Sequence, residues 1–394
     1  MKKILFVALL LCNYAIAQIK TGEQVPDIEF KQLLNSSLKT AKLSQFKGKI
    51  VFIEFWATWC SPCVAAMPHL QELQKKYKNQ LQVITVTAET DKRIELFLKT
   101  RPSNLIFAID TSYSLAKVFP HATIPHSVLI DAEGKLIANT LPDEINEVVI
   151  EKLLRKQKVA LTEKVDNMST DFIKDYFFAS DTVKSRLMIQ PEIKGGPGMY
   201  IQHRSSSAFA GRRLTMINLT LESIYRLAYG DFAYGRVMDL TGNDEKNKKE
   251  MFCLDIITER KEDLLPTLKA ELLKRFELQA KITSLLKPVY VLKIADINKV
   301  NKILLSDKSE KEGYGGGSGT FSGDAVVFAD IAEYLESFGI VNLPVVDETN
   351  TNRKFNIQMV YQPEKPETLT KSLADLGLKL EKSERIIEIL TLYK

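Results

Sequence analysis

An apolar run that leads into two closely spaced cysteines is the feature that most constrains the fold of this chain. Residues 49–55 (KIVFIEF) are rich in residues that favour β-strands, and Cys60 and Cys63 follow shortly after. The pattern predicts a buried strand that ends at a C-x-x-C motif, with an amphipathic helix beginning at the motif. The apolar residues that recur at helical spacing after the motif are Val64, Met67, Leu70, Leu73 and Tyr77.

The alternation of strands and helices continues to about residue 157. Further strands are expected at residues 81–86, 104–109, 127–130 and 135–138. Helices are expected around residues 94–98, 112–118 and 148–153. The order β-α-β-α-β-α-β-β-α predicts an α/β fold with a mixed central sheet and helices on both of its faces.

The chemistry is expected where the first strand meets the first helix. Cys60 would lie at the positive end of the helix dipole, among unpaired backbone N–H groups. These groups stabilise a thiolate, which is the form that attacks a disulfide. The two-residue spacing lets Cys63 attack the resulting mixed disulfide and release the product. Pro62 fixes one φ angle and stiffens the short ring.

Glu54 is the polar residue that interrupts the first apolar strand, six residues before Cys60. A carboxyl group in such a setting should have a raised pKa and would accept the proton of Cys63 when that thiol attacks. The alternative is an edge position at which Glu54 faces water. We favour the functional interpretation, because perturbed carboxyl groups concentrate at active sites.

Pro125 stands in the segment Thr123-Ile124-Pro125-His126, immediately before a predicted strand. Cis peptide bonds are almost confined to X-Pro, but only ~5% of X-Pro bonds in folded proteins are cis. From these residues alone, a trans bond is therefore favoured.

The stretch 51–68, VFIEFWATWCSPCVAAMP, resembles the thioredoxin superfamily, and most closely the exported branch that includes the TlpA and ResA proteins. Residues 22–27 (GEQVPD) and 43–49 (LSQFKGK) match the usual lead-in of that branch. Residues 124–134 (IPHSVLIDAEG) match a later segment of it. The resemblance covers residues 20–157, and its FWATWCxPC motif is highly specific.

The resemblance implies that Cys60 is the attacking thiol and Cys63 the resolving thiol, and that the two form a disulfide. It also implies a cis bond before Pro125, which would place the backbone of Ile124 beside Cys60 and align a substrate chain. The residues expected to contact that chain are Trp59, Ser61, Pro62 and Ile124.

Glu54 occupies the position of the buried acid of thioredoxins. Many exported reductases also carry a glutamate three residues after the second cysteine, where this chain has Ala66. Proton transfer would therefore depend on Glu54 alone.

The remaining residues divide into a predicted helical linker at 158–189 and an α+β domain at 190–394. A strand followed by a helix is expected within residues 214–230, with further strands near 252–257, 289–294, 345–347, 355–360 and 386–392, and helices near 264–276, 331–338 and 369–376. The glycine-rich segment 313–319 (GYGGGSG) is interpreted as a flexible joint between two possible parts of this domain. Helix–strand segments beginning at Glu271 and Ser372 show a faint internal echo, which suggests two related units.

This C-terminal region resembles a bacterial domain of unknown function, DUF3738. The resemblance depends on residues 219–230, 272–295, 343–360 and 373–381, and it implies no activity. No catalytic constellation is evident in it: His203 is isolated, and Cys253 lies in an apolar strand where a buried, inert thiol is favoured over an intermolecular disulfide.

The N-terminal residues 1–17 read as a signal peptide, with Lys2 and Lys3, an apolar run, and Ala15-Ile16-Ala17 as the cleavage site. A lipid anchor at Cys12 is less favoured, because a leucine rather than a small residue precedes it. We therefore expect an exported, periplasmic protein that is soluble after cleavage. Two catalytic cysteines suit that oxidising compartment. The net charge of +5 is mild and gives no reason to invoke nucleic acid.

The favoured function is an exported thiol–disulfide oxidoreductase that acts on disulfide-containing exported proteins and receives electrons from a membrane donor. The resemblance alone favours a reductant, and no cofactor is expected. A zinc site is disfavoured, because structural zinc needs four ligands and the chain has no second C-x-x-C motif. The only nearby histidines are His69, His121 and His126. The alternative is an envelope docking protein, in which the C-terminal domain recruits a partner and the redox domain is accessory.

Overall fold

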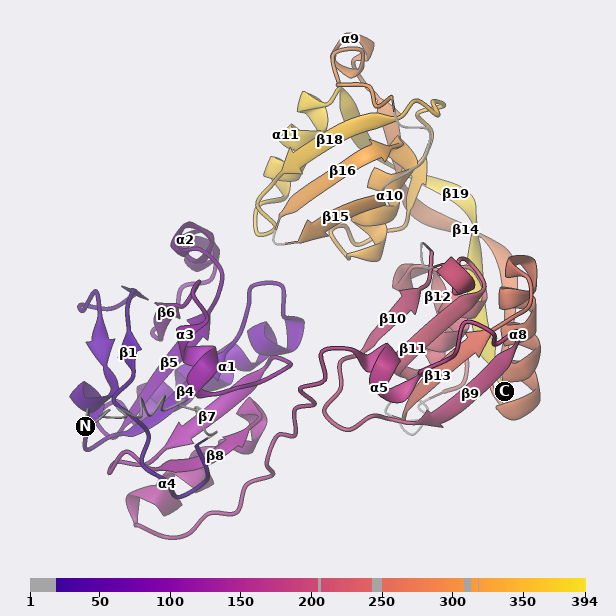
Figure 1. Ribbon diagram of the computed structural model, residues 1–394. Coiled ribbons are helices and arrows are strands. Elements are labelled where there is room, and N and C mark those ends of the chain that lie inside the picture. Colours follow the sequence, from indigo (N-terminus) through magenta and orange to yellow (C-terminus); the bar gives the residue numbers. More distant parts are fainter. Residues whose placement is uncertain (1–18, 205–206, 243–249, 308–312, 318) are drawn as a thin grey trace, which may run out of the picture. The chain divides into compact units, whose positions relative to one another are not determined.

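The computed structural model describes residues 19–394, except for residues 205–206, 243–249, 308–312 and 318. The expected signal segment, with Cys12, lies outside the described residues. The chain divides into two compact units that meet between Val165 and Asp166 (Figure 1). Among the described residues, no helix has the length and apolar character needed to cross a membrane.

The N-terminal unit is built on one six-stranded sheet with the order β2-β6-β5-β4-β7-β8. Strands β4, β5 and β6 are parallel, whereas β7, β8 and β2 run antiparallel to their neighbours, so the sheet is mixed. In the same order, the strands are Leu33–Leu34, Ile106–Ile109, Leu81–Thr87, Ile50–Phe55, His126–Ile130 and Leu136–Thr140.

Helices cover both faces of this sheet, which confirms the predicted fold class. One core cluster packs α1, α2 and α4 against one face, and a second packs α3 and the N-terminal segment against the other. The helices are α1 (Ser61–Lys76), α2 (Asp91–Thr100), α3 (Ser114–Val118) and α4 (Glu147–Leu154). The N-terminal segment holds β1 (Glu29–Phe30), β3 (Ala41–Lys42) and the 3₁₀ helix η1 (Leu43–Phe46), and η2 (Pro142–Glu144) precedes α4.

The prediction of a helical linker at residues 158–189 is wrong for most of that range. Residues 157–169 are extended or irregular, and α5 (Phe172–Tyr176) is the one helix in the linker range. Val159 and Leu161 pack on the core of the N-terminal unit, and the Lys164 N–H donates to the Asn139 carbonyl of the edge strand β8. An edge strand offers unpaired backbone groups, so the chain satisfies them by continuing in an extended form rather than as a helix.

The first lobe of the C-terminal unit is a four-stranded antiparallel sheet with the order β10-β11-β13-β9. Its strands are Met199–Gln202, Arg213–Thr220, Met251–Ile257 and Arg186–Pro191, so β9 begins inside the range expected to be linker. Helices α6 (Leu221–Ala228) and α8 (Leu264–Arg275) share a core cluster with it. The described residues of this lobe also form the 3₁₀ turns η3 (Ser207–Phe209), η4 (Tyr234–Arg236) and η5 (Lys261–Asp263).

The second lobe has a three-stranded sheet, β15-β16-β18, with helices α10 and α11 packed in its core cluster. The elements are β15 (Gly313–Gly317), β16 (Thr320–Val326), β18 (Phe355–Val360), α10 (Phe328–Ser337) and α11 (Pro366–Asp375), and α9 (Ile297–Val300) precedes β15. The expected flexible joint at 313–319 is therefore wrong, because the glycine run forms a paired strand. Gly316 is required there, since a Cβ atom on it would lie 2.5 Å from the ring of Tyr334.

A long two-stranded ribbon is shared by the two lobes. Strands β14 (Gln279–Ile294) and β19 (Leu378–Tyr393) pair antiparallel over all 16 residues (Figure 1). Strand β14 begins in the core of the first lobe and ends in the second lobe, where β17 (Val345–Asp347) pairs with it. Strand β19 begins in the core of the second lobe and ends in the first lobe, where β12 (Val237–Asp239) pairs with it. The two segments of the sequence echo fall on α8 with β14 and on α11 with β19, each a helix followed by a 16-residue strand.

The two residues singled out in the C-terminal region are both structural. Cys253 is a buried free thiol, as expected, and its Sγ lies 3.2 Å from the Asn218 side-chain oxygen. His203 is not isolated: its Nε2 lies 3.0 Å from the Thr215 hydroxyl, which in turn donates to the buried Asp255 carboxylate. Burial, and then the positive charge of Arg213, lower the pKa of His203.

Candidate active site

The cysteine motif lies where the central strand β4 passes into helix α1. Cys60 is the N-cap residue of α1, and its Sγ accepts a hydrogen bond from the Cys63 N–H at 3.3 Å. The two cysteines form a disulfide, with their Cα atoms 5.3 Å apart. Cys60 is 5% exposed and Cys63 is fully buried, so Cys60 is the sulfur nearer to solvent. The unpaired N–H groups of the first helical turn favour negative charge at this sulfur.

A carboxylate from a neighbouring loop holds the segment that precedes Cys60. Glu89, which follows β5, accepts hydrogen bonds from both the backbone N–H and the hydroxyl of Thr58, the latter at 2.8 Å. Arg93 Nε also donates to the Thr58 hydroxyl at 3.2 Å. Because β4 and β5 are parallel, their carboxyl ends meet at one edge of the sheet, where these residues come together. Glu89 is not evident from the sequence, in which its one signal is its place two residues after a buried parallel strand.

We expect Glu89→Gln to slow attack by Cys60 several-fold and to lower the free energy of unfolding by about 1–2 kcal/mol, because a charged acceptor of two hydrogen bonds is lost. The measurement is reaction of the reduced protein with a bis(nitrobenzoate) disulfide, together with denaturant unfolding. The exposed Glu95 of α2 supplies the matched control Glu95→Gln. Equal behaviour of the two variants would contradict a role for Glu89 in holding the loop.

Glu54 is buried in the centre of the sheet, because β4 lies between β5 and β7. The alternative of a water-facing edge position is therefore wrong. Its Oε2 accepts a hydrogen bond from the Ser127 hydroxyl, while its Oε1 has no hydrogen-bond partner. Burial raises the pKa of Glu54 to about 8, against the opposing effects of the Ser127 hydrogen bond and the Lys164 charge.

Glu54 and the cysteines share one side of the sheet. Ile50 and Phe52, which alternate with Glu54 along β4, belong to the same core cluster as Cys60 and Cys63. Side chains two residues apart on a strand point to the same face, so Glu54 faces the α1 side. A titratable group with a raised pKa thus lies on the same side of the sheet as the buried cysteine.

The Ile124–Pro125 peptide bond is cis, as the family resemblance implies and contrary to expectation from these residues alone. Pro125 lines an open groove of ≈650 Å³ beside α1. The residues that line it are Pro62, Ala65, Ala66, His69, Pro125, Leu141, Pro142 and Asp143. Ala66 stands where many exported reductases carry a glutamate, which leaves the groove largely apolar.

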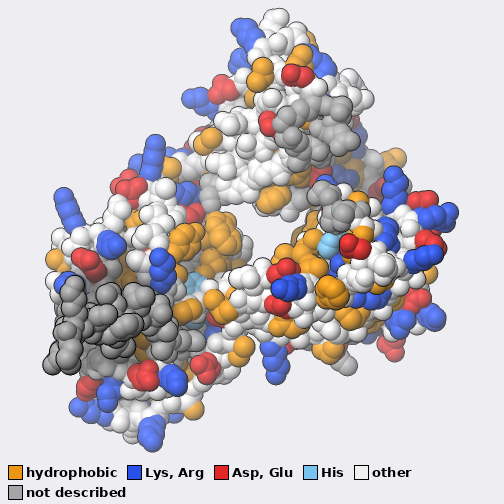
Figure 2. Space-filling view, in the orientation of Figure 1, with side chains coloured by type: hydrophobic (Ala, Val, Ile, Leu, Met, Phe, Trp, Pro, Cys, Tyr) orange, Lys and Arg blue, Asp and Glu red, His pale blue; other side chains and the backbone are white. Residues whose placement is uncertain are grey.

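Three residues expected to contact substrate lie outside this groove. Trp59 and Ser61 are exposed beside the motif, and Ile124 is half-buried against the core. Figure 2 shows hydrophobic side chains gathered at one part of the visible face of the N-terminal unit, with charged side chains spread over the rest. Trp59, at 62% exposure, is among the exposed large hydrophobic residues of this unit.

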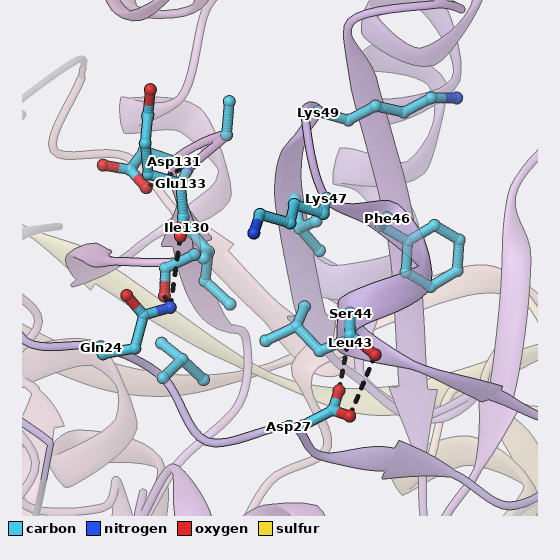
Figure 3. A pocket seen from close by; sticks show the side chains of 14 residues that line it. Gln24, Asp27, Leu43, Ser44, Phe46, Lys47, Lys49, Ile130, Asp131 and Glu133 are labelled. Carbon is cyan, nitrogen blue, oxygen red and sulfur yellow. Dashed lines mark hydrogen bonds between the residues drawn. The ribbon is translucent and has the colours of Figure 1, made fainter.

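A second, smaller pocket of ≈190 Å³ lies between the N-terminal segment and the turn after β7 (Figure 3). Its polar groups bond to one another: the Ser44 N–H and hydroxyl donate to the Asp27 carboxylate at 2.8 and 3.0 Å. The Gln24 side-chain amide donates to the Gly134 carbonyl at 2.9 Å. These contacts hold the N-terminal segment to the sheet, and none involves the cysteine motif.

The fold and the site together define a thioredoxin-like protein with a disulfide-forming C-x-x-C centre. Residues 20–154 match the family model described as Redoxin. The thiol-disulfide oxidoreductase ResA of Bacillus thuringiensis subsp. konkukian is 34% identical over 141 residues, which cover 35% of this chain and 79% of the relative. The chain belongs to this family of ResA-like thiol-disulfide oxidoreductases and is an enzyme of that class.

Other matches cover the same part of the chain. The thioredoxin-like protein YneN of Bacillus subtilis is 32% identical over 120 residues, which cover 29% of this chain and 68% of that protein. The crystal structure of the exposed lipoprotein thioredoxin of Streptococcus pneumoniae matches with 28% identity and a TM-score of 0.30, covering 33% of this chain and 99% of that one.

The C-terminal unit matches the family model described as protein of unknown function (DUF3738) over residues 231–394. The predicted resemblance is thus confirmed, although the match begins after α6 rather than at residue 190. That description assigns no activity, so the alternative of a docking protein with an accessory redox domain gains no support.

Proposed function

We propose that this oxidoreductase reduces or exchanges disulfides of exported proteins, with Cys60 as the nucleophile and Cys63 as the resolving thiol. The observation that carries the proposal is the asymmetry of the motif, in which Cys60 lies nearer to solvent at the helix N-terminus and Cys63 is buried on the side of Glu54. The attacking sulfur must be reached by a second protein, whereas the resolving sulfur need only reach Cys60.

The reaction balances in two displacement steps. The Cys60 thiolate attacks one sulfur of the client disulfide, forms a mixed disulfide and displaces the first client thiolate. Cys63 then gives its proton to Glu54 and attacks the Cys60 sulfur, which displaces the second client thiolate. The enzyme ends as the Cys60–Cys63 disulfide, and two electrons with two protons from an upstream membrane donor restore the dithiol.

The client is proposed to bind across Pro125 and the groove beside α1. Pro125 and Pro62 of the motif line the same groove, which supports a site where the Ile124 backbone would align an extended client segment, with Trp59, Ser61 and Pro62 in contact with it. The largely apolar lining, including Ala66, suits client segments that carry an apolar side chain near their cysteine.

Export is proposed from the N-terminal sequence: residues 1–17 would be removed and the mature chain would begin at Gln18, in the periplasm of the cell envelope. The mass of the mature protein recovered from the envelope tests this proposal. A chain that begins with a lipid-modified Cys12 would contradict it.

The direction of electron flow is tested by the reduction potential of the Cys60–Cys63 pair, measured by equilibration in thiol buffers. We expect a value near that of thioredoxin, about −270 mV, because the sequence resemblance to the exported thioredoxin-like branch favours a reductant. A value near that of DsbA, about −120 mV, would mean an oxidant and would overturn the reductase assignment.

A further inference from the structure

The segment that leaves the redox fold, residues 157–165, is held against the sheet that carries the active site. We call it the return segment. The Lys164 N–H donates to the Asn139 carbonyl at 2.9 Å, and the Thr140 hydroxyl donates to the Thr162 carbonyl at 2.6 Å. Val159 and Leu161 pack on the core cluster that contains both active-site cysteines. The return segment therefore belongs physically to the redox fold, although it leads directly to the C-terminal unit.

A row of buried polar side chains runs from Glu54 to the return segment. Glu54 on β4 is paired with Ser127 on β7, and Ser127 is paired with Thr140 on β8. Directly opposed residues of antiparallel strands present their side chains on the same face. All three are essentially inaccessible to solvent, and Thr140 bonds to Thr162 of the return segment.

The Lys164 side chain of the return segment supplies a positive charge that acts on Glu54. It is half-buried, and its Nζ donates to the Thr123 carbonyl at 2.7 Å. Thr123 directly precedes the Ile124–Pro125 cis bond. The Lys164 charge lowers the pKa of Glu54 and so opposes the effect of burial. One side chain thus touches the loop before Pro125 and acts electrostatically on the buried acid.

The other groups around Glu54 do not supply this charge. Its neighbours on β5 and β7 are Thr85 and Ser127, which are uncharged at neutral pH. His126 lies on the opposite face of β7, stacked on His121 and packed against Phe55. From α1, the titratable groups on the Glu54 side are the two active-site thiols and His69, whose Nε2 lies 2.8 Å from the Ile145 carbonyl, and η2 presents Asp143 to the groove.

We propose that Lys164 is a positioning residue for proton transfer: its ammonium group stabilises the Glu54 carboxylate and holds the loop before Pro125. Of the return segment, Lys164 then contributes to the redox site. This inference rests on the proposed function of Glu54 as the proton acceptor of Cys63. Its distinctive consequence is that Lys164 acts on the second displacement, in which Cys63 loses its proton, and not on the first.

The test uses the full-length reduced protein and a bis(nitrobenzoate) disulfide, which releases one coloured thiolate when Cys60 attacks and a second when Cys63 resolves the mixed disulfide. Lys164→Met removes the charge at similar length. We expect the second phase to slow about tenfold near neutral pH and to recover at higher pH, because loss of the Lys164 charge raises the pKa of Glu54 and leaves less of the carboxylate to accept the proton. The first phase should change less than about twofold, because Cys60 makes no use of Glu54.

Two variants serve as controls. Lys164→Arg keeps the charge and should retain most of the second-phase rate, and Lys158→Met removes an exposed charge from the same segment and should change neither phase. In a Glu54→Gln background, Lys164→Met should have no further effect on the pH profile.

Two results would overturn the inference: equal slowing of both phases by Lys164→Met, or the same slowing when Glu54 is already glutamine. Either would mean that Lys164 only supports the structure of the loop. A second phase unchanged by Glu54→Gln alone is a different outcome, since it would remove the proposed acceptor itself and with it the basis of the inference.

Discussion

The Cys63→Ser variant is expected to accumulate a mixed disulfide with its client, whereas Cys60→Ser forms none. Each variant should lose at least about 100-fold in turnover of a disulfide substrate, because both displacements belong to one cycle. The mixed disulfide is detected by mass spectrometry after rapid acid quenching. Its formation by Cys63→Ser follows from the position of Cys60, which is nearer to solvent and caps the helix, whereas Cys63 is fully buried.

The remaining thiol of the described chain provides the control. Cys253 is buried in β13 of the C-terminal unit and contacts Asn218, so Cys253→Ser should leave turnover and trapping unchanged. A mixed disulfide trapped by Cys60→Ser through Cys63 would reverse the assignment of the two cysteines.

Glu54→Gln is expected to make the protein more stable at neutral pH while impairing it as an enzyme. Burial raises the pKa of Glu54 from 4.5 to about 8, so between these values the folded chain holds a proton that the unfolded chain has released. Stability therefore falls as the pH rises through this window, by up to about 1.4 kcal/mol per pH unit. Glutamine does not titrate, so at pH 7 the free energy of unfolding of the variant should exceed that of the wild type by about 3 kcal/mol.

Denaturant unfolding at pH 4.5 and pH 8 separates this effect from a general change in packing. The free energies of unfolding of wild type and variant should converge at the lower pH and differ most at the higher one. A constant difference at both values would contradict a raised pKa for Glu54. In the same variant, release of the mixed disulfide should slow more than its formation, and equal slowing would contradict the role of proton acceptor.

The sequence predicted strands β4 to β8 of the N-terminal unit well, because they are largely buried or bounded by clear turns, whereas β1, β2 and β3, of two residues each, are too short to show a pattern and were missed. Strand β4 is the plainest case, since all six of its residues are buried between β5 and β7. The ribbon was found only in part: residues 289–294 and 386–392 were expected, but the strands start at Gln279 and Leu378. In the missed portions exposed and partly buried residues are mixed, so no continuous apolar run marks them.

The glycine run at 313–319 shows how composition misleads when packing determines the choice of residue. Glycine usually signals flexibility, but Gly316 leaves room for the ring of Tyr334 beneath a paired hairpin. Tyr334 lies eighteen positions away in a helix, and no local pattern connects the two.

The same physical reason hid two long-range hydrogen bonds of the N-terminal unit. Glu89 bonds to Thr58 and Lys164 bonds to Thr123, at separations of 31 and 41 residues. A charged residue at an exposed-looking position gives no sign of a distant backbone group that it will bind. Glu54 was found because it breaks an apolar strand, which is a local signal.

Because the two-stranded ribbon of β14 and β19 is shared by both lobes, a change in a strand that begins in one lobe of the C-terminal unit disrupts the other lobe. The last residues of β19 pair with β12, and Leu390 and Leu392 fill the core of the first lobe, far along the chain from the second lobe in which β19 begins. Trimming the final few residues would therefore open the first lobe, although β19 begins in the second lobe. Each lobe depends on a strand that begins in the other, so the two should melt in a single cooperative transition, and a polypeptide cut between them should regain structure only when the two fragments are mixed.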